Sequence, residues 1–221
     1  MSKGLIHKKG IPIIIIAFFT FAIIASLFCV FIKIFFLQIG IIIAGILLLF
    51  FVIRFFRRPL SRELIKNENY VLSPADGVVA AIETVEDKRF FKDKRIQVSV
   101  FMSMYNIHIN WYPISGEVIS TEYQKGKHLV ARNPKSSLKN EMFECVIKHS
   151  SGKEIMYRQI AGAVARRILS YPEKGKEVQQ SDESGIILFG SRLDVLLPTD
   201  AKIKLKIGQK VKAASSVIAE I

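Results

Sequence analysis

The chain has 221 residues and a formal net charge of +13, a length that allows one ordinary domain with or without a membrane anchor. Residues 1–60 contain no Asp or Glu and contribute +7; residues 61–221 contain 25 basic and 19 acidic residues, which leaves +6. Only two cysteines are present, Cys29 and Cys145, so a disulfide-rich framework is excluded, and no Cys/His metal pattern is visible.

Two uncharged apolar stretches make up most of the N-terminal part. They cover residues 11–32 and 34–53, and only Lys33 separates them. About 20 apolar residues suffice for a helix to cross a hydrocarbon core of roughly 30 Å, so we predict a transmembrane helical hairpin within residues 1–53. A signal peptide fits poorly, because its apolar region is shorter and ends at a small-residue cleavage site. A buried helix pair in a soluble protein is the remaining alternative.

Gly40 and Gly45 are expected to let the two helices approach closely. The flanking charges predict the orientation, since Lys and Arg favour the cytoplasmic side. Lys33 alone lies in the turn, whereas both outer flanks are basic, with Lys3, Lys8, Lys9, Arg54, Arg57, Arg58 and Arg62. We therefore expect an inner or plasma membrane protein with residues 61–221 in the cytoplasm. The basic excess of that part favours an anionic membrane surface, and no nucleic-acid motif is present.

Residues 54–69 are expected to form a linker, and a single domain is predicted over residues 70–221. Short β-rich runs, bounded by Pro, Gly and charged clusters, predict a mainly β (β-rich α+β) fold. One stretch, Gln159–Leu169, is considered for a short helix, and alternation places His108 and Asn110 on one face of a strand. The expected strands are Gly77–Val85, Ile96–Met102, Asn106–Trp111, Gly116–Glu122, Phe143–His149, Glu154–Ile160, 186–197, 201–207 and 217–221.

Two phrases, Ser73–Ala80 and Ile207–Ala219, resemble the hairpins of lipoyl- and biotinyl-type β-sandwiches. By themselves they predict architecture only. A membrane-tethered adaptor or carrier domain without enzymatic activity is therefore one interpretation of the chain. A carrier of that type displays a modified lysine at a hairpin tip, and no such lysine motif appears between Val79 and Gly116 or near Ile207.

The pair Gly190-Ser191 lies between two apolar β runs. Such a pair is most often a bulge or a tight turn. Chemically, it offers an unhindered carbonyl on Gly190 and a hydroxyl nucleophile on the next residue. If the backbone there is strained, the hydroxyl can attack the carbonyl and move the acyl group from nitrogen to oxygen.

The stretch Phe189–Pro198 (FGSRLDVLLP) resembles the processing site of phosphatidylserine decarboxylase proenzymes, in the short form of bacteria and archaea. The resemblance covers residues 60–221, and further matching segments follow in the family's order. They are Ser73–Gly77, His108–Asn110 with Pro113 and Gly116, Gly126–Ala131, Asn140–Glu141, Gln159–Arg167 and Ile207–Ala219. One such phrase is weak, but six in order are specific.

The resemblance implies self-cleavage at Gly190-Ser191 into chains 1–190 and 191–221, which stay together as a heterodimer. Ser191 would be the nucleophile, and it would become a covalently bound pyruvoyl group after β-elimination and loss of ammonia. That ketone would form a Schiff base with phosphatidylserine, which loses carbon dioxide to give phosphatidylethanolamine. Neither a metal nor pyridoxal phosphate would be needed. A pyruvoyl decarboxylase for another amine-bearing substrate is an alternative, although the membrane hairpin favours a lipid.

The resemblance also implies roles for two further residues. Asp76 matches the acid–base residue of self-cleavage, although an Asp that precedes a Gly is usually just part of a turn. His108 matches the proton donor in decarboxylation, and imidazole titrates near neutral pH. Three basic residues near a matching segment, Lys127, Arg132 and Lys135, are candidates for binding the lipid phosphate.

The sequence departs from the family at one important position. Longer members have a second histidine three positions after the first, and Trp111 occupies that position here. Either His108 serves both steps, or Asp76 activates Ser191 without a histidine partner. His128 and His149 have no motif support, and we expect them on the surface.

Overall fold

The computed structural model describes residues 4–59, 62–126, 140–162, 167–188 and 191–221. The chain divides into two compact units, Met1–Leu60 and Ser61–Ile221. Each unit is described by itself.

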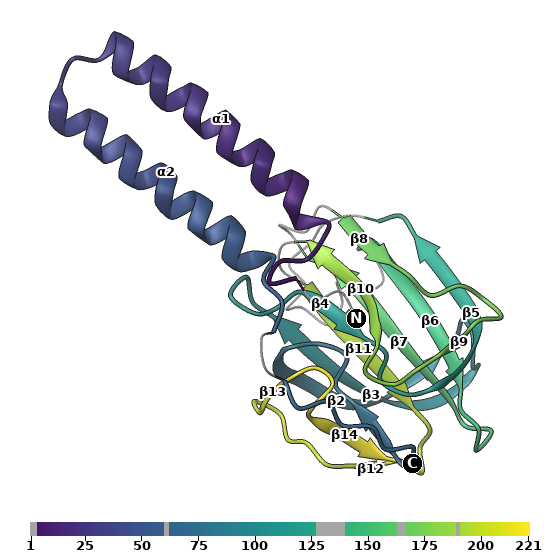
Figure 1. Ribbon diagram of the computed structural model, residues 1–221. Coiled ribbons are helices and arrows are strands. Elements are labelled where there is room, and N and C mark those ends of the chain that lie inside the picture. Colours follow the sequence, from purple (N-terminus) through teal and green to yellow (C-terminus); the bar gives the residue numbers. More distant parts are fainter. Residues whose placement is uncertain (1–3, 60–61, 127–139, 163–166, 189–190) are drawn as a thin grey trace. The chain divides into compact units, whose positions relative to one another are not determined.

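The first unit is a pair of antiparallel helices, α1 (Gly10–Phe31) and α2 (Phe35–Phe55), which confirms the predicted hairpin (Figure 1). Both are long and apolar enough to cross a membrane, with a mean hydropathy of 2.9. Gly45 is required for their close packing, because an added Cβ would lie 1.6 Å from Cε2 of Phe21. Gly40 has no neighbour within 4 Å of such an atom, so the approach predicted there is not observed.

Polar contacts close both ends of the helix pair. The Gln38 amide donates hydrogen bonds to the carbonyls of Ile32 (2.7 Å) and Cys29 (3.1 Å), which lie at the end of α1 and lack helical partners. At the other end, the backbone N–H of His7 donates to the Phe56 carbonyl at 2.8 Å. The apolar side chains between these ends point outward, and Phe31 is 80% exposed. A helix pair buried in a soluble core would cover such side chains.

The second unit is built from antiparallel β-sheets (Figure 1). The largest sheet curls and has eight strands. In spatial order they are β13 (Lys210–Val211), β2 (Gly77–Asp87), β3 (Asp93–Met102), β11 (Ser191–Leu197), β7 (Glu154–Ala161), β6 (Met142–Lys148), β5 (Gly116–Gln124) and β9 (Glu177–Val178). Two smaller sheets follow the orders β1 (Tyr70–Leu72), β14 (Val217–Glu220), β12 (Lys202–Ile203), and β4 (Ile109–Trp111), β10 (Glu183–Leu188), β8 (Arg167–Ser170).

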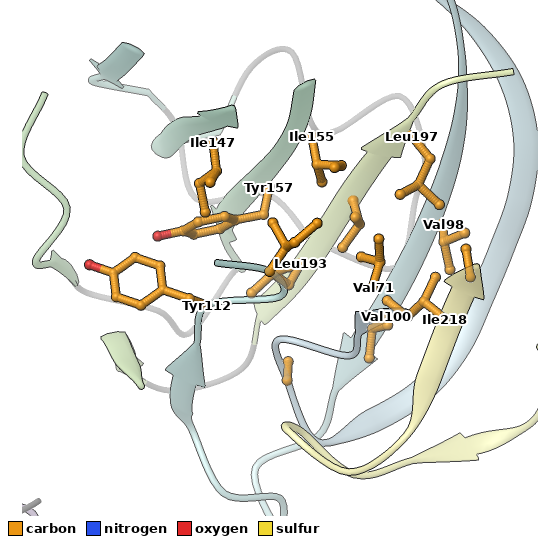
Figure 2. Close-up of a cluster of buried hydrophobic side chains, with 14 of the residues drawn as sticks. Val71, Val98, Val100, Tyr112, Ile147, Ile155, Tyr157, Leu193, Leu197 and Ile218 are labelled. Atoms are coloured by element: carbon orange, nitrogen blue, oxygen red, sulfur yellow. The ribbon is translucent and has the colours of Figure 1, made fainter. Parts of the chain in front are cut away.

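Strand β11 lies in the middle of the large sheet and is buried along its whole length. It pairs with β3 on one side and with β7 on the other. Because side chains alternate along a strand, Leu193, Val195 and Leu197 enter the main hydrophobic core (Figure 2). Leu196 belongs to a separate cluster on the opposite face, the face that Arg192 and Asp194 share by alternation.

The two hairpin phrases lie side by side, in agreement with the expected sandwich elements. The N–H of Ser73 donates to the Ser216 carbonyl (2.8 Å), and the N–H of Gly208 donates to the Val79 carbonyl (2.8 Å). Strands β13 and β2 extend this contact through the pair Lys210–Val78. The phrases therefore form one substructure, although more than 120 residues separate them in the sequence.

Most of the predicted strands are present with shifted ends, but the strand expected over 186–197 is two strands of different sheets, β10 (Glu183–Leu188) and β11 (Ser191–Leu197). The helix considered over Gln159–Leu169 is wrong in the part of that stretch that the structure describes. Gln159 lies in β7, and Leu169 lies in β8. Strand pairing explains the difference, because β7 is hydrogen-bonded to both β6 and β11, and such tertiary pairing overrides local helical preference.

The segment from Arg62 to Asn69 is hydrogen-bonded to the β unit. The N–H of Asn67 donates to Oε1 of Gln180 at 2.8 Å, and the Ser181 hydroxyl donates to the Ile65 carbonyl at 3.0 Å. In the structure, therefore, the second half of the expected linker packs onto the domain that it enters.

Candidate active site

Ser191 is the first residue of β11, and it is fully buried. Ser191 and Leu193 are two positions apart on the strand, so their side chains point to the same face of the sheet. Leu193 lies in the main hydrophobic core, so the Ser191 side chain faces that core. The hydroxyl donates to the sulfur of Met102 at 3.2 Å, and a thioether is only a weak acceptor. Met102 and Ala161 are its register partners on the two neighbouring strands. Gly190, the other half of the expected cleavage site, lies outside the described residues.

A chain of buried polar side chains continues from Met102. Nδ2 of Asn110 lies 3.8 Å from the Met102 sulfur, and Oδ1 of Asn110 accepts a hydrogen bond from Nε2 of Gln159 at 2.8 Å. The Ser170 hydroxyl donates to Oε1 of Gln159. These residues come from β3, β4, β7 and β8, so the chain connects the large sheet to the β4–β10–β8 sheet beside Ser191.

His108 immediately precedes β4 and is fully buried. Its carbonyl accepts a hydrogen bond from the N–H of Ile187 at 3.2 Å, four residues before Ser191. Its Nδ1 lies 3.0 Å from the carbonyl oxygen of Asn106. A carbonyl only accepts, so this contact assigns the proton to Nδ1 and leaves Nε2 as the basic atom of the neutral ring.

Asp76 lies just before β2, and both of its carboxylate oxygens have partners. Oδ1 accepts the backbone N–H of Ala213 at 2.8 Å, and Oδ2 forms an ion pair with Nη2 of Arg62 at 2.8 Å. Both side chains are nearly buried, with 12% and 9% exposure. The same guanidinium donates to the Ala213 carbonyl at 3.0 Å and lies 5.0 Å from the ring centroid of Trp111.

The strand register relates Asp76 to Ser191. Val78 pairs with Phe101, and the next residue, Met102, pairs with Ser191. Asp76 therefore lies at the same end of the sheet as Ser191, with β3 between them. Two strand spacings amount to about 10 Å. Among the described contacts, the carboxylate and the hydroxyl do not bond to each other.

The phrase Asn140–Glu141 fixes the strand next to Ser191. The Asn140 amide donates to the carbonyl of Ala161 at 2.8 Å, and the N–H of Ala161 donates to the Glu141 carbonyl at 2.9 Å. Ala161 is the partner of Ser191 across the β11–β7 ladder. The Glu141 carboxylate accepts the Tyr123 hydroxyl at 3.1 Å. Asn140 and Glu141 therefore fix the backbone of the strand that neighbours Ser191.

The structure brings Ser191, His108 and Asp76 into one region, and it adds residues that the sequence did not single out. Arg62 had been noted only as a charge flanking the second span, and Met102 only as the end of an apolar strand. The candidate phosphate ligands Lys127, Arg132 and Lys135 lie outside the described residues, as does His128. His149 is buried, with Nδ1 bonded to Ser151 at 2.9 Å, so its expected surface position is wrong.

No group of three His, Cys, Asp or Glu side chains is arranged to hold a metal ion in the part of the chain that the structure describes. Among the described residues, the polar groups that continue from Ser191 through Met102 are amides, hydroxyls and a thioether. This donor set does not suit a divalent metal, and it suits hydrogen bonding to a carbonyl-containing group.

Comparisons with known proteins place the chain among named relatives. The family model for phosphatidylserine decarboxylase matches residues 48–219. A phosphatidylserine decarboxylase proenzyme of Amoebophilus asiaticus is 49% identical over 179 residues, covering 81% of this chain and 79% of the relative. Proenzymes of the same name from Cytophaga hutchinsonii and Bacteroides fragilis are each 40% identical. The match with the Cytophaga hutchinsonii protein covers 97% of this chain and 98% of that relative. The match with the Bacteroides fragilis protein covers 100% of this chain and 97% of that relative.

Proposed function

The chain belongs to the phosphatidylserine decarboxylase family, and on that premise we propose that Ser191 is the residue from which its catalytic group is made. The protein is a decarboxylase proenzyme that converts phosphatidylserine to phosphatidylethanolamine. Family membership does not support the alternative of a non-enzymatic adaptor. The observation that supports the role of Ser191 is its position, a buried hydroxyl at the first residue of the central strand β11.

Self-cleavage begins when the Ser191 hydroxyl attacks the Gly190 carbonyl and converts the peptide bond into an ester. Loss of the Ser191 Cα proton then breaks the Cβ–O bond, and residues 1–190 leave with a terminal carboxylate. Water replaces the nitrogen on the unsaturated residue, ammonia departs, and a pyruvoyl group begins the chain of residues 191–221. The site supports this route because, among the contacts of the described residues, the hydroxyl donates to a weak acceptor, the Met102 sulfur.

The surroundings of Ser191 fit the product of this reaction. The Asn110 and Gln159 amides lie in the same buried region, because Asn110 contacts Met102, the partner of the Ser191 hydroxyl, and Gln159 donates to Asn110. When present, the pyruvoyl group supplies a carbonyl that binds the substrate amine and takes up the electrons released with carbon dioxide. The new chain stays bound as a heterodimer, because β11 remains paired with β3 and β7 along its length.

His108 is the proton donor to the substrate carbon after carbon dioxide leaves. The Asn106 carbonyl fixes its ring and directs Nε2 to exchange the proton. Asp76 is the acid–base group of self-cleavage. Its contact with the Ser191 hydroxyl forms only as the reaction begins, since catalytic hydrogen bonds are often unmade in a resting site.

The N-terminal helices hold the enzyme at the bilayer that contains its substrate. Lys and Arg at both outer ends of the hairpin support a cytoplasmic position for the β unit, next to an anionic surface. Lys127, Arg132 and Lys135 are proposed to bind the lipid phosphate. Protease added to inverted membrane vesicles should digest the β unit, and digestion only in vesicles of native orientation would contradict the cytoplasmic assignment.

The test is Ser191→Ala, with Ser99→Ala as a matched control. Ser99 is also a buried serine in the same sheet, on β3. We expect the Ser191→Ala chain to remain a single 25.0 kDa species and to form no phosphatidylethanolamine from vesicles. Ser99→Ala should be cut and active. An uncut Ser191→Ala chain with full activity would overturn the proposal.

A further inference from the structure

The carboxylate of Asp76 is held by a residue from far outside its own motif. Arg62 lies fourteen residues earlier, in the segment that enters the β unit. Its fork-shaped guanidinium donates to Oδ2 of Asp76 and to the carbonyl of Ala213, while the N–H of Ala213 donates to Oδ1. One side chain and one peptide unit therefore fix both oxygens of a nearly buried carboxylate. A planar guanidinium makes such paired contacts, and an ammonium does not.

Trp111 completes this cluster from the other side. The Arg62 guanidinium lies 5.0 Å from the centre of its ring, and its backbone N–H donates to the carbonyl of Pro74 at 3.0 Å. Trp111 is three residues after His108, and the residue is only 4% exposed. Its ring gives the Arg62 guanidinium a cation–π partner in addition to the Asp76 carboxylate.

The chemistry of these side chains decides which of them can exchange a proton. An indole N–H only donates, and a guanidinium stays protonated in proteins. Neither Trp111 nor Arg62 can accept a proton from Ser191. Within this cluster, the Asp76 carboxylate is the one group able to do so. Its orientation depends on the Arg62 guanidinium at Oδ2 and on the N–H of Ala213 at Oδ1.

We propose that Arg62 is a positioning residue for self-cleavage, which holds the Asp76 carboxylate in a fixed orientation at the end of the sheet where Ser191 begins β11. This inference rests on the proposed function of Asp76 and Ser191. It assigns to Arg62, whose guanidinium lies over the Trp111 ring, the orientation of the acid–base group in a chain that has no histidine at position 111. Arg62 acts through Asp76 and does not touch the reacting atoms.

The test compares the rate at which newly made full-length chain, inserted in membrane vesicles, converts to its two fragments. The variants are Arg62→Ala, Arg62→Lys, Asp76→Asn and the double variant Arg62→Ala with Asp76→Asn. Arg95→Ala is the matched control, because Arg95 also pairs with an aspartate (Asp93, 2.7 Å) and lies over an aromatic ring (Phe91, 3.5 Å). A misplaced catalytic group costs on the order of 100-fold in rate, so we expect Arg62→Ala to slow conversion by about that factor.

Three further results are expected if Arg62 acts through Asp76. Arg62→Lys recovers part of the rate, and added methylguanidinium speeds conversion of Arg62→Ala but not of Asp76→Asn. The double variant converts no more slowly than Asp76→Asn alone, since two residues acting on one function are not additive. Arg95→Ala converts at the wild-type rate.

Each contrary result has a distinct meaning. Arg62→Ala conversion at the wild-type rate, or an equal slowing by Arg62→Ala in the Asp76→Asn background, overturns the role of Arg62 and leaves the proposed function intact. If Arg62→Ala does not fold, a wild-type rate in Arg62→Lys, whose ammonium cannot make the paired contacts, overturns it as well. A wild-type chain that never converts overturns the proposed function itself, and Asp76→Asn conversion at the wild-type rate removes both assignments.

Discussion

At the scale of single residues, burial determines what each ionisable group near Ser191 can do. His108 is fully buried, and the backbone carbonyl of Asn106 contacts Nδ1 of its ring at 3.0 Å. A neutral imidazole in this setting can receive a proton at Nε2 and deliver it to carbon. This geometry suits one proton transfer in the decarboxylation step.

Replacing His108 by Ala should leave self-cleavage intact and lower decarboxylation by roughly 10²- to 10⁴-fold, the usual contribution of a positioned acid–base group. Release of carbon dioxide from phosphatidylserine vesicles, normalised to cut protein, measures the effect. His149→Ala is the control, since His149 is also buried but bonds to Ser151 in the turn after β6. Wild-type turnover in His108→Ala would remove His108 from the site, and an uncut chain would assign it to both steps.

Cys145 is a second nucleophilic side chain in this domain, and its burial lowers the reactivity of its thiol. Burial raises the pKa of its thiol to about 12. In a Cys29→Ser background, a thiol reagent at pH 8 should leave the folded protein unlabelled and should label it after denaturation, as measured by intact mass. Labelling of the folded chain would show that this part of the core opens to solvent.

The same shift has a consequence for stability. The unfolded chain releases the thiol proton near an ordinary pKa of about 9, whereas the folded chain holds it to about 12. This contribution to stability is therefore complete below pH 9 and is lost as pH rises toward 12. The pKa of Tyr112, raised by burial and by Cys145, acts in the same direction.

Sequence motifs identified Ser191, Asp76 and His108, because each lies in a short phrase that can be read locally. The partners of these residues could not be predicted in that way. Arg62 and Ala213 meet at Asp76, and Met102 meets Ser191, only because the sheets bring together segments that are far apart in the chain. Local composition carries no information on such pairs.

At the scale of elements, buried charged side chains form a row across the large sheet, on the face of β11 that points away from the main core. Asp194 pairs in register with Arg158 on β7, and Arg158 with Glu144 on β6. Nε of Arg158 lies 2.5 Å from Oε1 of Glu144, and Arg192 bonds to Asp194 at 2.8 Å. Buried pairs of this kind add little net stability, but the loss of one partner is costly.

Glu144→Gln should therefore lower the free energy of unfolding by about 3 kcal/mol, because it leaves the buried Arg158 with less compensating charge. Denaturant unfolding of the detergent-solubilised chain, in an uncut Ser191→Ala background, provides the measurement. Asp200→Asn is the control, since its ion pair with Lys153 is exposed and its loss should change little. Equal effects of the two substitutions would show that the buried row is not a coupled network.

The strands themselves were largely predictable, since their apolar alternation is visible in the sequence. The helix considered over residues 159–169 was not correct, because its Ala-rich composition does not reveal that Gln159 is buried between two neighbouring strands. The charged row was also missed. A charge on a strand normally indicates a solvent-facing position, and only the curled sheet covers these side chains.

At the scale of the whole molecule, the sequence predicted a transmembrane helical hairpin followed by a β domain, and the structure has two apolar helices long enough to span a membrane, followed by a β-rich unit. This division could be predicted because a membrane span leaves a strong compositional signal, with 22 and 20 uncharged residues in succession. How Arg62 to Asn69 pack on the β unit could not be predicted, since that segment looks like an ordinary polar linker.

The account depends most on one covalent event, the opening of the peptide bond before Ser191. Intact-mass measurement of the purified wild-type chain tests it directly, together with reduction by borohydride, which adds two hydrogens to a ketone. The account predicts two species, residues 1–190 and residues 191–221, with the smaller one lacking an amino terminus and gaining the mass of two hydrogens. A single 25.0 kDa species with an unmodified serine at position 191 would contradict it.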